Sequence, residues 1–204
     1  MDLDRLQELA KKYMKDRKSH RDRETGAVYY HGLRVSRGVT ELRKMLTEDG
    51  GWDERLRAAA LFHDIGKGFP RHARMGAVLA RELLKEEMTA QELEDVCGLI
   101  AAHQDRRPGS DVYSFWQKLL QDADLLDHYG AQGLWLCCYY SACHDDEMKE
   151  LVKFYEGEWQ GQIVEHRALL NFEPSQLIFD EKTEFEMSVA RRMKLEGKGG
   201  YVYG

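Results

Sequence analysis

The sequence predicts an all-α fold, and three features of its 204 residues support this prediction. Apolar residues recur every three or four positions along nearly the whole chain, which is the spacing of one face of an α-helix. The alternation of apolar and polar residues that is typical of half-buried strands is nearly absent. The chain has only three prolines, and each lies between helix-like stretches.

Eight helices are expected, separated by short segments that contain glycine, proline or polar residues. Gly50 and Gly51 separate the second helix from the third, and residues 67–70 end the third. Thr89 followed by Glu92 predicts a capping box at the start of the fifth helix. The expected helices cover residues 2–18, 30–47, 53–66, 72–87, 89–104, 112–141, 145–168 and 175–195.

The length and a hydrophobic content of 43% suffice for one domain with its own core. We expect a single helical domain over residues 1–204, with its core at about 28–141 and a C-terminal helical extension at about 145–196. No internal repeat or low-complexity linker divides the sequence. The glycine-rich segment 197–204 predicts a loose end.

The composition argues against several classes of partner. A net charge of −6 disfavours a broad surface for polymeric nucleic acid or for an anionic membrane, although it allows a local basic pocket. No apolar run approaches the roughly 20 residues that span a bilayer, and the N-terminus does not resemble a secretory signal. The four cysteines lack zinc-ribbon spacing and are expected to be buried thiols. We therefore expect a cytoplasmic protein.

Four expected helices each carry a histidine or aspartate on their apolar face. His31 opens the face of the second helix, and His63 continues that of the third, with Asp64 directly after it. His103 follows the apolar face of the fifth helix, and Asp124 that of the sixth. The apolar faces are formed by Val35, Gly38, Val39, Leu42, Met45 and Leu46; by Leu56, Ala59 and Ala60; by Leu93, Val96, Cys97 and Ile100; and by Trp116, Leu119, Leu120 and Ala123.

Burying such groups singly is costly, because an unpaired buried carboxylate must find a partner or become neutral. Each residue alone could be a hydrogen-bonded core histidine or a helix cap. The whole set is better explained by a shared divalent cation, since neutral imidazole and carboxylate are common ligands of such ions. The pattern therefore predicts a metal site where these helices meet.

Three segments resemble the motifs of a known superfamily. Residues 61–67 (LFHDIGK) are similar to the signature of the HD-domain phosphohydrolases, and residues 30–35 (YHGLRV) to its upstream histidine motif. Residues 122–127 (DADLLD) resemble its distal aspartate motif, so the resemblance covers about residues 28–130. It implies an HD-domain-like helical bundle that binds a divalent metal and hydrolyses phosphoester or phosphoanhydride bonds, usually of nucleotides. The implied metal ligands are His31, His63, Asp64 and Asp124.

Within the superfamily the sequence resembles small bacterial HD hydrolases in particular, but its motifs are similar to more than one branch of them. Residues 122–133 (DADLLDHYGAQG) are similar to a group that includes nucleoside-triphosphate pyrophosphohydrolases. The IGK sequence at 65–67 is more typical of other branches, including the symmetrical dinucleoside tetraphosphate hydrolases. The Gly-Tyr-Pro motif of cyclic-dinucleotide phosphodiesterases is missing after the His63-Asp64 pair, which disfavours that branch.

Two more histidines bear on the number of metal ions. His72 and His103 match positions that hold a second ion in the two-metal branch of the superfamily, where the aspartate of the HD pair bridges both. The alternative is a one-metal site in which these histidines contact substrate phosphate or water. We expect one or two ions per chain, with manganese, iron, cobalt or nickel favoured over calcium and with magnesium also compatible.

Several further residues are candidates for catalysis and substrate binding. Asp64 and Lys67 are expected to take part in catalysis, with Lys67 contacting phosphate. Asp127, three residues after Asp124, is expected to orient a water molecule or a ligand imidazole. Substrate contacts are also expected from Arg71 and Arg74, which flank His72, and from Arg34, one turn after His31. For each of these arginines, a solvated surface position is the alternative.

The expected ligand is thus a small phosphorylated molecule, and a nucleotide is favoured. Two alternatives remain open at this point. One is a non-catalytic HD module that binds nucleotide or metal in signalling, although such a module need not retain all the metal ligands. The other is a di-iron oxygenase of the HD type, against which Lys67 and the neighbouring arginines favour phosphate.

Overall fold

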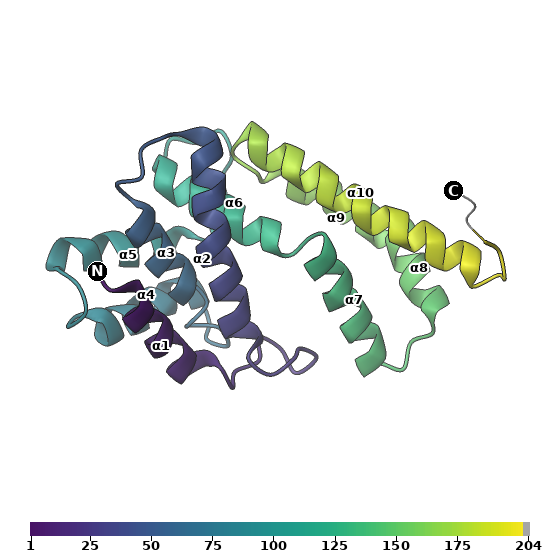
Figure 1. Cartoon of the computed structure of the whole chain (residues 1–204), viewed down its shortest axis with the longest axis horizontal. Coiled ribbons are helices and arrows are strands. Elements are labelled where there is room, and N and C mark those ends of the chain that lie inside the picture. Colours follow the sequence, from purple (N-terminus) through teal and green to yellow (C-terminus); the bar gives the residue numbers. More distant parts are fainter. Residues whose placement is uncertain (202–204) are drawn as a thin grey trace. The chain divides into compact units, whose positions relative to one another are not determined.

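A computed structural model describes residues 1–201 and shows helices and no strand in that part of the chain (Figure 1). The all-α prediction is therefore confirmed. The helices are α1 (Leu3–Met14), α2 (Ala27–Leu46), α3 (Asp53–Phe62), α4 (His72–Leu84), α5 (Ala90–Ala102), α6 (Phe115–Asp127), α7 (Ala131–Cys143), α8 (Met148–Glu156), α9 (Glu158–Ala168) and α10 (Glu173–Glu196).

Two of the expected helices are each divided in the structure, so these two predictions were wrong. The expected helix 112–141 is interrupted between α6 and α7, where Gly130 has a φ of 75°. Its N–H group donates to Glu186 Oε1 at 2.6 Å, outside any helical ladder, and glycine adopts such a φ without steric cost. The expected helix 145–168 is interrupted at Gly157, which ends α8 and begins α9.

The chain forms two compact units, Met1–Asp124 and Leu125 onward. In the first unit α3 is central: it packs against α1, α2 and α5, while α4 packs on α5. The small side chains of Ala58, Ala59 and Ala60 are fully buried, which lets the neighbouring helices approach α3 closely. Leu56 and Phe62 are also fully buried, and each such large side chain contributes roughly 1.5–3 kcal/mol.

The helix faces in the first unit follow the sequence with two exceptions, whereas the expected helices 2–18 and 53–66 each end four residues earlier, at Met14 and Phe62. The capping box of Thr89 and Glu92 is present at the start of α5. On α2, Val35, Val39 and Leu42 are buried as expected. Gly38 and Met45, which were expected on the same face, are exposed. Both lie three residues after a buried position, at the edge of the apolar face.

In the second unit α10 packs against α7, α8 and α9 around a core of Leu151, Tyr155, Trp159 and Ala190. The prediction of one domain over 1–204, with a core at 28–141 and an extension at 145–196, stays a prediction. Residues 197–201 continue beyond α10 without regular helix, as expected, and residues 202–204 lie outside the described residues.

Two expectations from the composition can be compared with the structure. Within residues 1–201 no helix combines the length and the apolar character needed to cross a bilayer. All four cysteines are free thiols, and Cys97 is buried as expected. Cys137 and Cys138 are half-buried, and Cys143 is exposed, so the expectation of a buried thiol was wrong for Cys143, which is the last residue of α7.

Candidate metal centre

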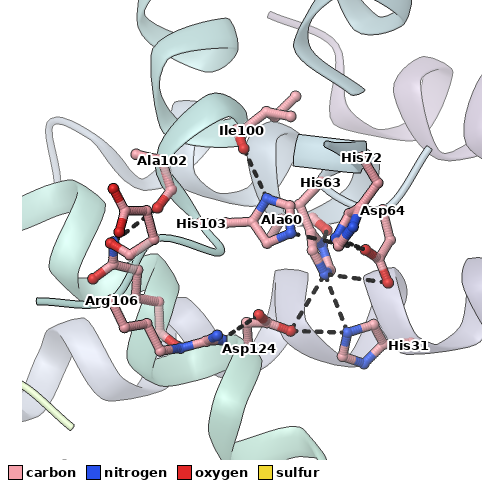
Figure 2. Close-up of polar contacts among 12 residues, drawn as sticks. His31, Ala60, His63, Asp64, His72, Ile100, Ala102, His103, Arg106 and Asp124 are labelled. Atoms are coloured by element: carbon pink, nitrogen blue, oxygen red, sulfur yellow. Dashed lines mark hydrogen bonds and ion pairs between the residues drawn. The ribbon is translucent and has the colours of Figure 1, made fainter. Parts of the chain in front are cut away.

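Six side chains from the first unit point toward one another in a buried region (Figure 2). They are His31, His63, Asp64, His72, His103 and Asp124. Five of the six are buried, and the exception is His72, whose side chain is 17% exposed. The structure therefore brings together all six residues that the sequence singled out as metal ligands, although their coordination of an ion stays a prediction.

The position of each side chain follows from where a helix ends or begins. His31 lies in the first turns of α2 and Asp124 near the end of α6. His63 directly follows α3, His72 is the first residue of α4, and His103 directly follows α5. Helix ends expose backbone groups and allow sharp changes of direction, so several side chains can converge on a small volume.

A tight turn connects α3 to α4 and carries Asp64 toward His72. Gly66 lies in this turn, and a Cβ atom there would be 2.3 Å from the carbonyl oxygen of His72 and 2.5 Å from the backbone nitrogen of Gly76. Only glycine allows this close approach of two backbone segments. The glycine of the IGK sequence thus has a structural role beside the candidate ligands.

Arg17 fixes the same turn from outside. Its guanidinium group donates to the carbonyl oxygen of Ile65 at 2.6 Å and to that of Lys67 at 2.8 Å. Charge-assisted hydrogen bonds of this kind are shorter and stronger than neutral ones. Sequence reasoning gave Arg17 no role, because it lies 48 residues before Ile65 and no local pattern connects them.

The first group of donors comprises His31, His63 and Asp124. His31 Nε2 is 3.0 Å from Asp124 Oδ1 and 3.1 Å from His63 Nε2, and His63 Nε2 is 3.4 Å from the same oxygen. His63 Nδ1–H donates to the carbonyl oxygen of Ala60 at 2.6 Å, so in the neutral ring Nε2 carries a lone pair. Three atoms rich in electron pairs therefore face one another at short distance, an arrangement that a cation would stabilise.

The second group comprises Asp64, His72 and His103. Asp64 Oδ1 is 3.4 Å from His72 Nε2 and 3.8 Å from His103 Nε2. His103 Nδ1–H donates to the carbonyl oxygen of Ile100 at 2.7 Å, which again directs the lone pair of Nε2 inward. The other oxygen of Asp64, Oδ2, is 3.9 Å from His63 Nε2. The two oxygens of Asp64 thus face different groups of donors.

The charges around both carboxylates keep them ionised. Burial by itself raises the pKa of Asp64, but His63, His72 and Lys67 more than offset it and hold this pKa well below its usual range. Burial likewise opposes ionisation of Asp124, yet its contacts with His31 and His63 and the charge of Arg106 keep its pKa well below the usual value.

Burial and the neighbouring His63 lower the pKa of His103 to about 4, so its imidazole is neutral at pH 7. Ionised carboxylates and neutral imidazoles are the protonation states in which these side chains bind metal. Mixed nitrogen and oxygen donors suit manganese, iron, cobalt or nickel. The residues present therefore fit a divalent transition-metal ion.

Two cations lie next to the carboxylates. Lys67 Nζ is 3.3 Å from Asp64 Oδ2, and its side chain is one-quarter exposed. Arg106 donates from its terminal nitrogen to Asp124 Oδ2 at 2.5 Å. Arg106 was missed at the sequence level, and only its position three residues after His103 could have indicated it.

The remaining candidates are three arginines and Asp127. Arg71 and Arg74 are exposed and line a hollow of about 550 Å³ together with Gln104 and Asp105. These lining residues are sequence neighbours of His72 and His103, so the hollow adjoins the second group of donors. Arg34 is half-buried on α2, and Asp127 is the last residue of α6 and belongs to the second unit; their roles stay predictions.

Comparison with known proteins identifies the family. Residues 28–131 match the family model of the HD domain. This chain belongs to the HD domain family. The predicted resemblance is thereby confirmed, and with it the membership of a superfamily of metal-dependent phosphohydrolases. No curated protein matches the chain.

Solved structures of small bacterial HD-domain proteins share the fold over almost the whole length. Bacillus subtilis YpgQ in complex with ADP has a TM-score of 0.66 at 16% identity, covering 95% of this chain and 96% of that chain. The Lin1889 protein from Listeria innocua has a TM-score of 0.63 at 19% identity, covering 97% and 98%. A Lactobacillus plantarum protein has a TM-score of 0.60 at 19% identity, covering 98% and 100%. At such identities the likeness shows the fold alone.

Proposed function

We propose that this HD-domain chain is a phosphohydrolase that cleaves a phosphoester or phosphoanhydride bond of a nucleotide. In this proposal His31, His63, Asp64 and Asp124 hold a divalent metal ion. The supporting observation is the first group of donors, in which two imidazole nitrogens and one carboxylate oxygen lie 3.0–3.4 Å from one another. Such a group is stabilised by a cation at its centre, and the family supplies the class of reaction.

When bound, a divalent ion would lower the pKa of water and offset negative charge on the phosphoryl oxygens. The chain's own residues would orient the reacting groups. Asp64 contributes a buried, ionised carboxylate whose oxygens face His63 of the first donor group and the histidines of the second. Lys67 places its ammonium group beside Asp64, where it can contact a phosphate oxygen and stabilise its charge.

We further propose that the centre holds two ions. The support is the geometry of Asp64, whose Oδ2 faces His63 while its Oδ1 faces His72 and His103. A carboxylate with its oxygens directed at two donor groups is suited to bridge two cations, as in two-metal hydrolytic sites. His72 and His103 would complete the second site.

The hollow beside His72 supports the proposal that the substrate is a nucleotide. A volume of about 550 Å³ lies within the usual range of small-molecule sites. Arg71 and Arg74 provide two guanidinium groups, which bind phosphate through paired hydrogen bonds. A phosphate chain could extend from the metal centre into this hollow, with Arg34 as a further candidate contact. The complex of the fold relative YpgQ with ADP is consistent with a nucleotide.

The alternatives make different predictions for one experiment. Protein loaded with Mn²⁺ would be incubated with a panel of nucleoside mono-, di- and triphosphates, cyclic nucleotides and dinucleoside polyphosphates, and the products separated by chromatography. We expect metal-dependent release of phosphate, pyrophosphate or nucleotide that stops on chelation. Binding of a nucleotide without turnover would instead identify a signalling module. Oxygen consumption by the iron-loaded protein, without phosphate release, would identify an oxygenase.

The role of the arginines can be tested with a double variant, Arg71→Ala with Arg74→Ala. Loss of two charge-assisted contacts to phosphate should raise KM by about tenfold or more while changing kcat much less. Arg37→Ala, which removes an exposed arginine from α2, serves as the matched control. An unchanged KM in the double variant would assign Arg71 and Arg74 to the solvated surface.

A further inference from the structure

We propose that Arg106 determines which divalent metal the centre accepts, because it restricts Asp124 to one coordinating oxygen. The proposal rests on the metal site proposed above. It concerns a residue outside the candidate ligands, in the segment between α5 and α6.

The two oxygens of Asp124 have different neighbours. Oδ1 faces the candidate ligands, at 3.0 Å from His31 Nε2 and 3.4 Å from His63 Nε2. Oδ2 accepts a hydrogen bond of 2.5 Å from the terminal nitrogen of Arg106. Figure 2 shows the carboxylate between Arg106 on one side and the two histidines on the other. With Oδ2 engaged in this way, Asp124 presents one oxygen to an ion.

The position of Arg106 is fixed by contacts of its own segment with α6. Gln121 on α6 donates from its side-chain amide to the carbonyl oxygens of Ala102 at 2.8 Å and Asp105 at 3.1 Å. The terminal nitrogen of Arg106 also donates to the carbonyl oxygen of Gln121 at 3.3 Å. Gln121 is fully buried, and the Arg106 side chain is 15% exposed. These contacts hold the guanidinium group against Asp124.

A buried N–H group of Arg106 indicates that its placement serves Asp124. The Nε atom is buried and has no acceptor among the described residues. A buried donor without an acceptor is costly. The ion pair with Asp124 and the hydrogen bond to Gln121 therefore outweigh this cost in positioning the side chain.

The number of oxygens that a carboxylate offers affects metal choice. Calcium accepts six to eight oxygen ligands and readily takes both oxygens of one carboxylate. Manganese, iron, cobalt and nickel bind sites of mixed imidazole and carboxylate donors, as here. If Arg106 no longer engages Oδ2, Asp124 can offer both oxygens, and calcium gains more from the added ligand than manganese does.

The ratio of two metal affinities separates this effect from simple electrostatics. The positive charge of Arg106 repels every divalent cation to a similar extent, so its removal should strengthen binding of both ions alike. A general loosening of the site should weaken both alike. Only a change in the coordination offered by Asp124 should alter the ratio of the dissociation constants for Ca²⁺ and Mn²⁺.

The test is calorimetric titration of the metal-stripped full chain with Mn²⁺ and, separately, with Ca²⁺. We expect wild-type protein to prefer Mn²⁺ and Arg106→Met to narrow the ratio of dissociation constants by about tenfold, the scale of effects seen for groups that orient metal ligands. Arg106→Lys retains a cationic donor and should keep most of the wild-type ratio. Arg107→Met, which removes a guanidinium group paired with exposed Asp105, should leave the ratio unchanged.

The outcomes distinguish this proposal from the one on which it rests. A wild-type chain that binds neither ion would overturn the proposed metal site. A wild-type chain that binds Mn²⁺, with an unchanged ratio in Arg106→Met, would overturn the role of Arg106 alone. If circular dichroism shows that Arg106→Met does not fold, Arg106→Gln replaces it. Its neutral amide holds Oδ2 more weakly, so the ratio should narrow by about threefold, and an unchanged ratio would again refute the proposal.

Discussion

Buried carboxylates occur in both units of the chain, and their surroundings differ. In the first unit, Asp64 and Asp124 lie among histidines and next to Lys67 and Arg106. In the second unit, Glu186 is 1% exposed on α10 and lies among largely neutral groups. Its Oε1 accepts the N–H of Gly130 at 2.6 Å, and its Oε2 accepts the hydroxyl of Tyr155 at 3.0 Å.

The pKa values move in opposite directions in the two places. Nearby cations and hydrogen bonds hold the pKa of Asp64 and of Asp124 well below the usual range, despite burial. For Glu186 burial dominates and raises the pKa to about 7, because the two hydrogen bonds and Lys182 offset it only in part. Burial alone therefore does not decide the charge of a carboxylate; its neighbours do.

This difference separates a site for a cation from a structural contact. Ionised carboxylates facing lone pairs of imidazole attract a metal ion. A carboxyl group that is partly protonated at neutral pH, held by a backbone N–H and a tyrosine hydroxyl, instead fixes local structure. Glu186 holds Gly130, the N-cap residue of α7, against α10. The predictions below test this contrast.

The largest effect is expected for Asp64→Ala. This variant removes the carboxylate that faces both donor groups, and a divalent ion contributes several kcal/mol to stabilising the transition state. Turnover of the best substrate with added Mn²⁺ should therefore fall by about 10³-fold or more. Steady-state kinetics measures the loss, and far-ultraviolet circular dichroism should show an unchanged helical content.

The control for this variant is Asp111→Ala, which removes an exposed aspartate from the same unit. We expect it to retain wild-type turnover. Near-normal activity of Asp64→Ala at saturating Mn²⁺ would contradict metal-assisted hydrolysis at this centre, whatever the substrate.

The second prediction concerns the number of ions. If His72 and His103 complete a second site, the fully loaded wild-type chain should contain about two ions, and His72→Ala with His103→Ala should contain about one. Elemental analysis of protein dialysed after metal loading measures this stoichiometry. His20→Ala, which removes an exposed histidine, should leave it unchanged.

The same double variant tests the alternative role for these histidines. If they contact only substrate phosphate, the metal content stays the same and KM rises instead. One ion in fully loaded wild-type protein would refute the two-metal proposal and leave His31, His63, Asp64 and Asp124 as the whole site.

Much of the first unit could be predicted from the sequence, because its signals are local. His31, His63 and Asp124 continue apolar helix faces, so helical spacing alone indicated that they point inward. The capping box at Thr89 was also readable, since its partners are three residues apart. Arg17 and Arg106 could not be assigned, because each acts on backbone or side chains that only the tertiary fold brings near.

The second unit shows the limit of local reasoning more clearly. The helical pattern of residues 112–141 continues through His128, Tyr129 and Gly130, so periodicity predicted one long helix. The interruption depends on Glu186, which lies 56 residues after Gly130 and accepts its N–H group. No pattern near residue 130 identifies that partner, and a glycine alone does not end a helix.

The last and smallest effect concerns Glu186 and the stability of the second unit. A carboxyl group whose pKa is raised on folding stabilises the fold fully below its unfolded pKa and loses this contribution as the pH rises through its folded pKa. The pKa of Glu186 in the folded chain is about 7. As the pH rises from about 4.5 to 7, the free energy of unfolding should therefore fall by roughly 2–3 kcal/mol. In Glu186→Gln the amide carbonyl can still accept one hydrogen bond and the group no longer ionises, so this decline should be absent.

The measurement is urea unfolding of wild type and Glu186→Gln at pH 5 and pH 8, followed by the tryptophan signal, to which buried Trp159 of the second unit contributes. The difference between the two proteins cancels the opposite pH dependence of Asp64 and Asp124, which have lowered pKa values in both. We expect the variant to gain stability relative to wild type from pH 5 to pH 8, and Glu181→Gln, on the exposed face of α10, to show no such gain. If the free energy of unfolding changes between pH 5 and pH 8 by the same amount in wild type and in Glu186→Gln, Glu186 is ionised throughout this pH range. The contrast between the two buried carboxylate regions would then be wrong for the second unit.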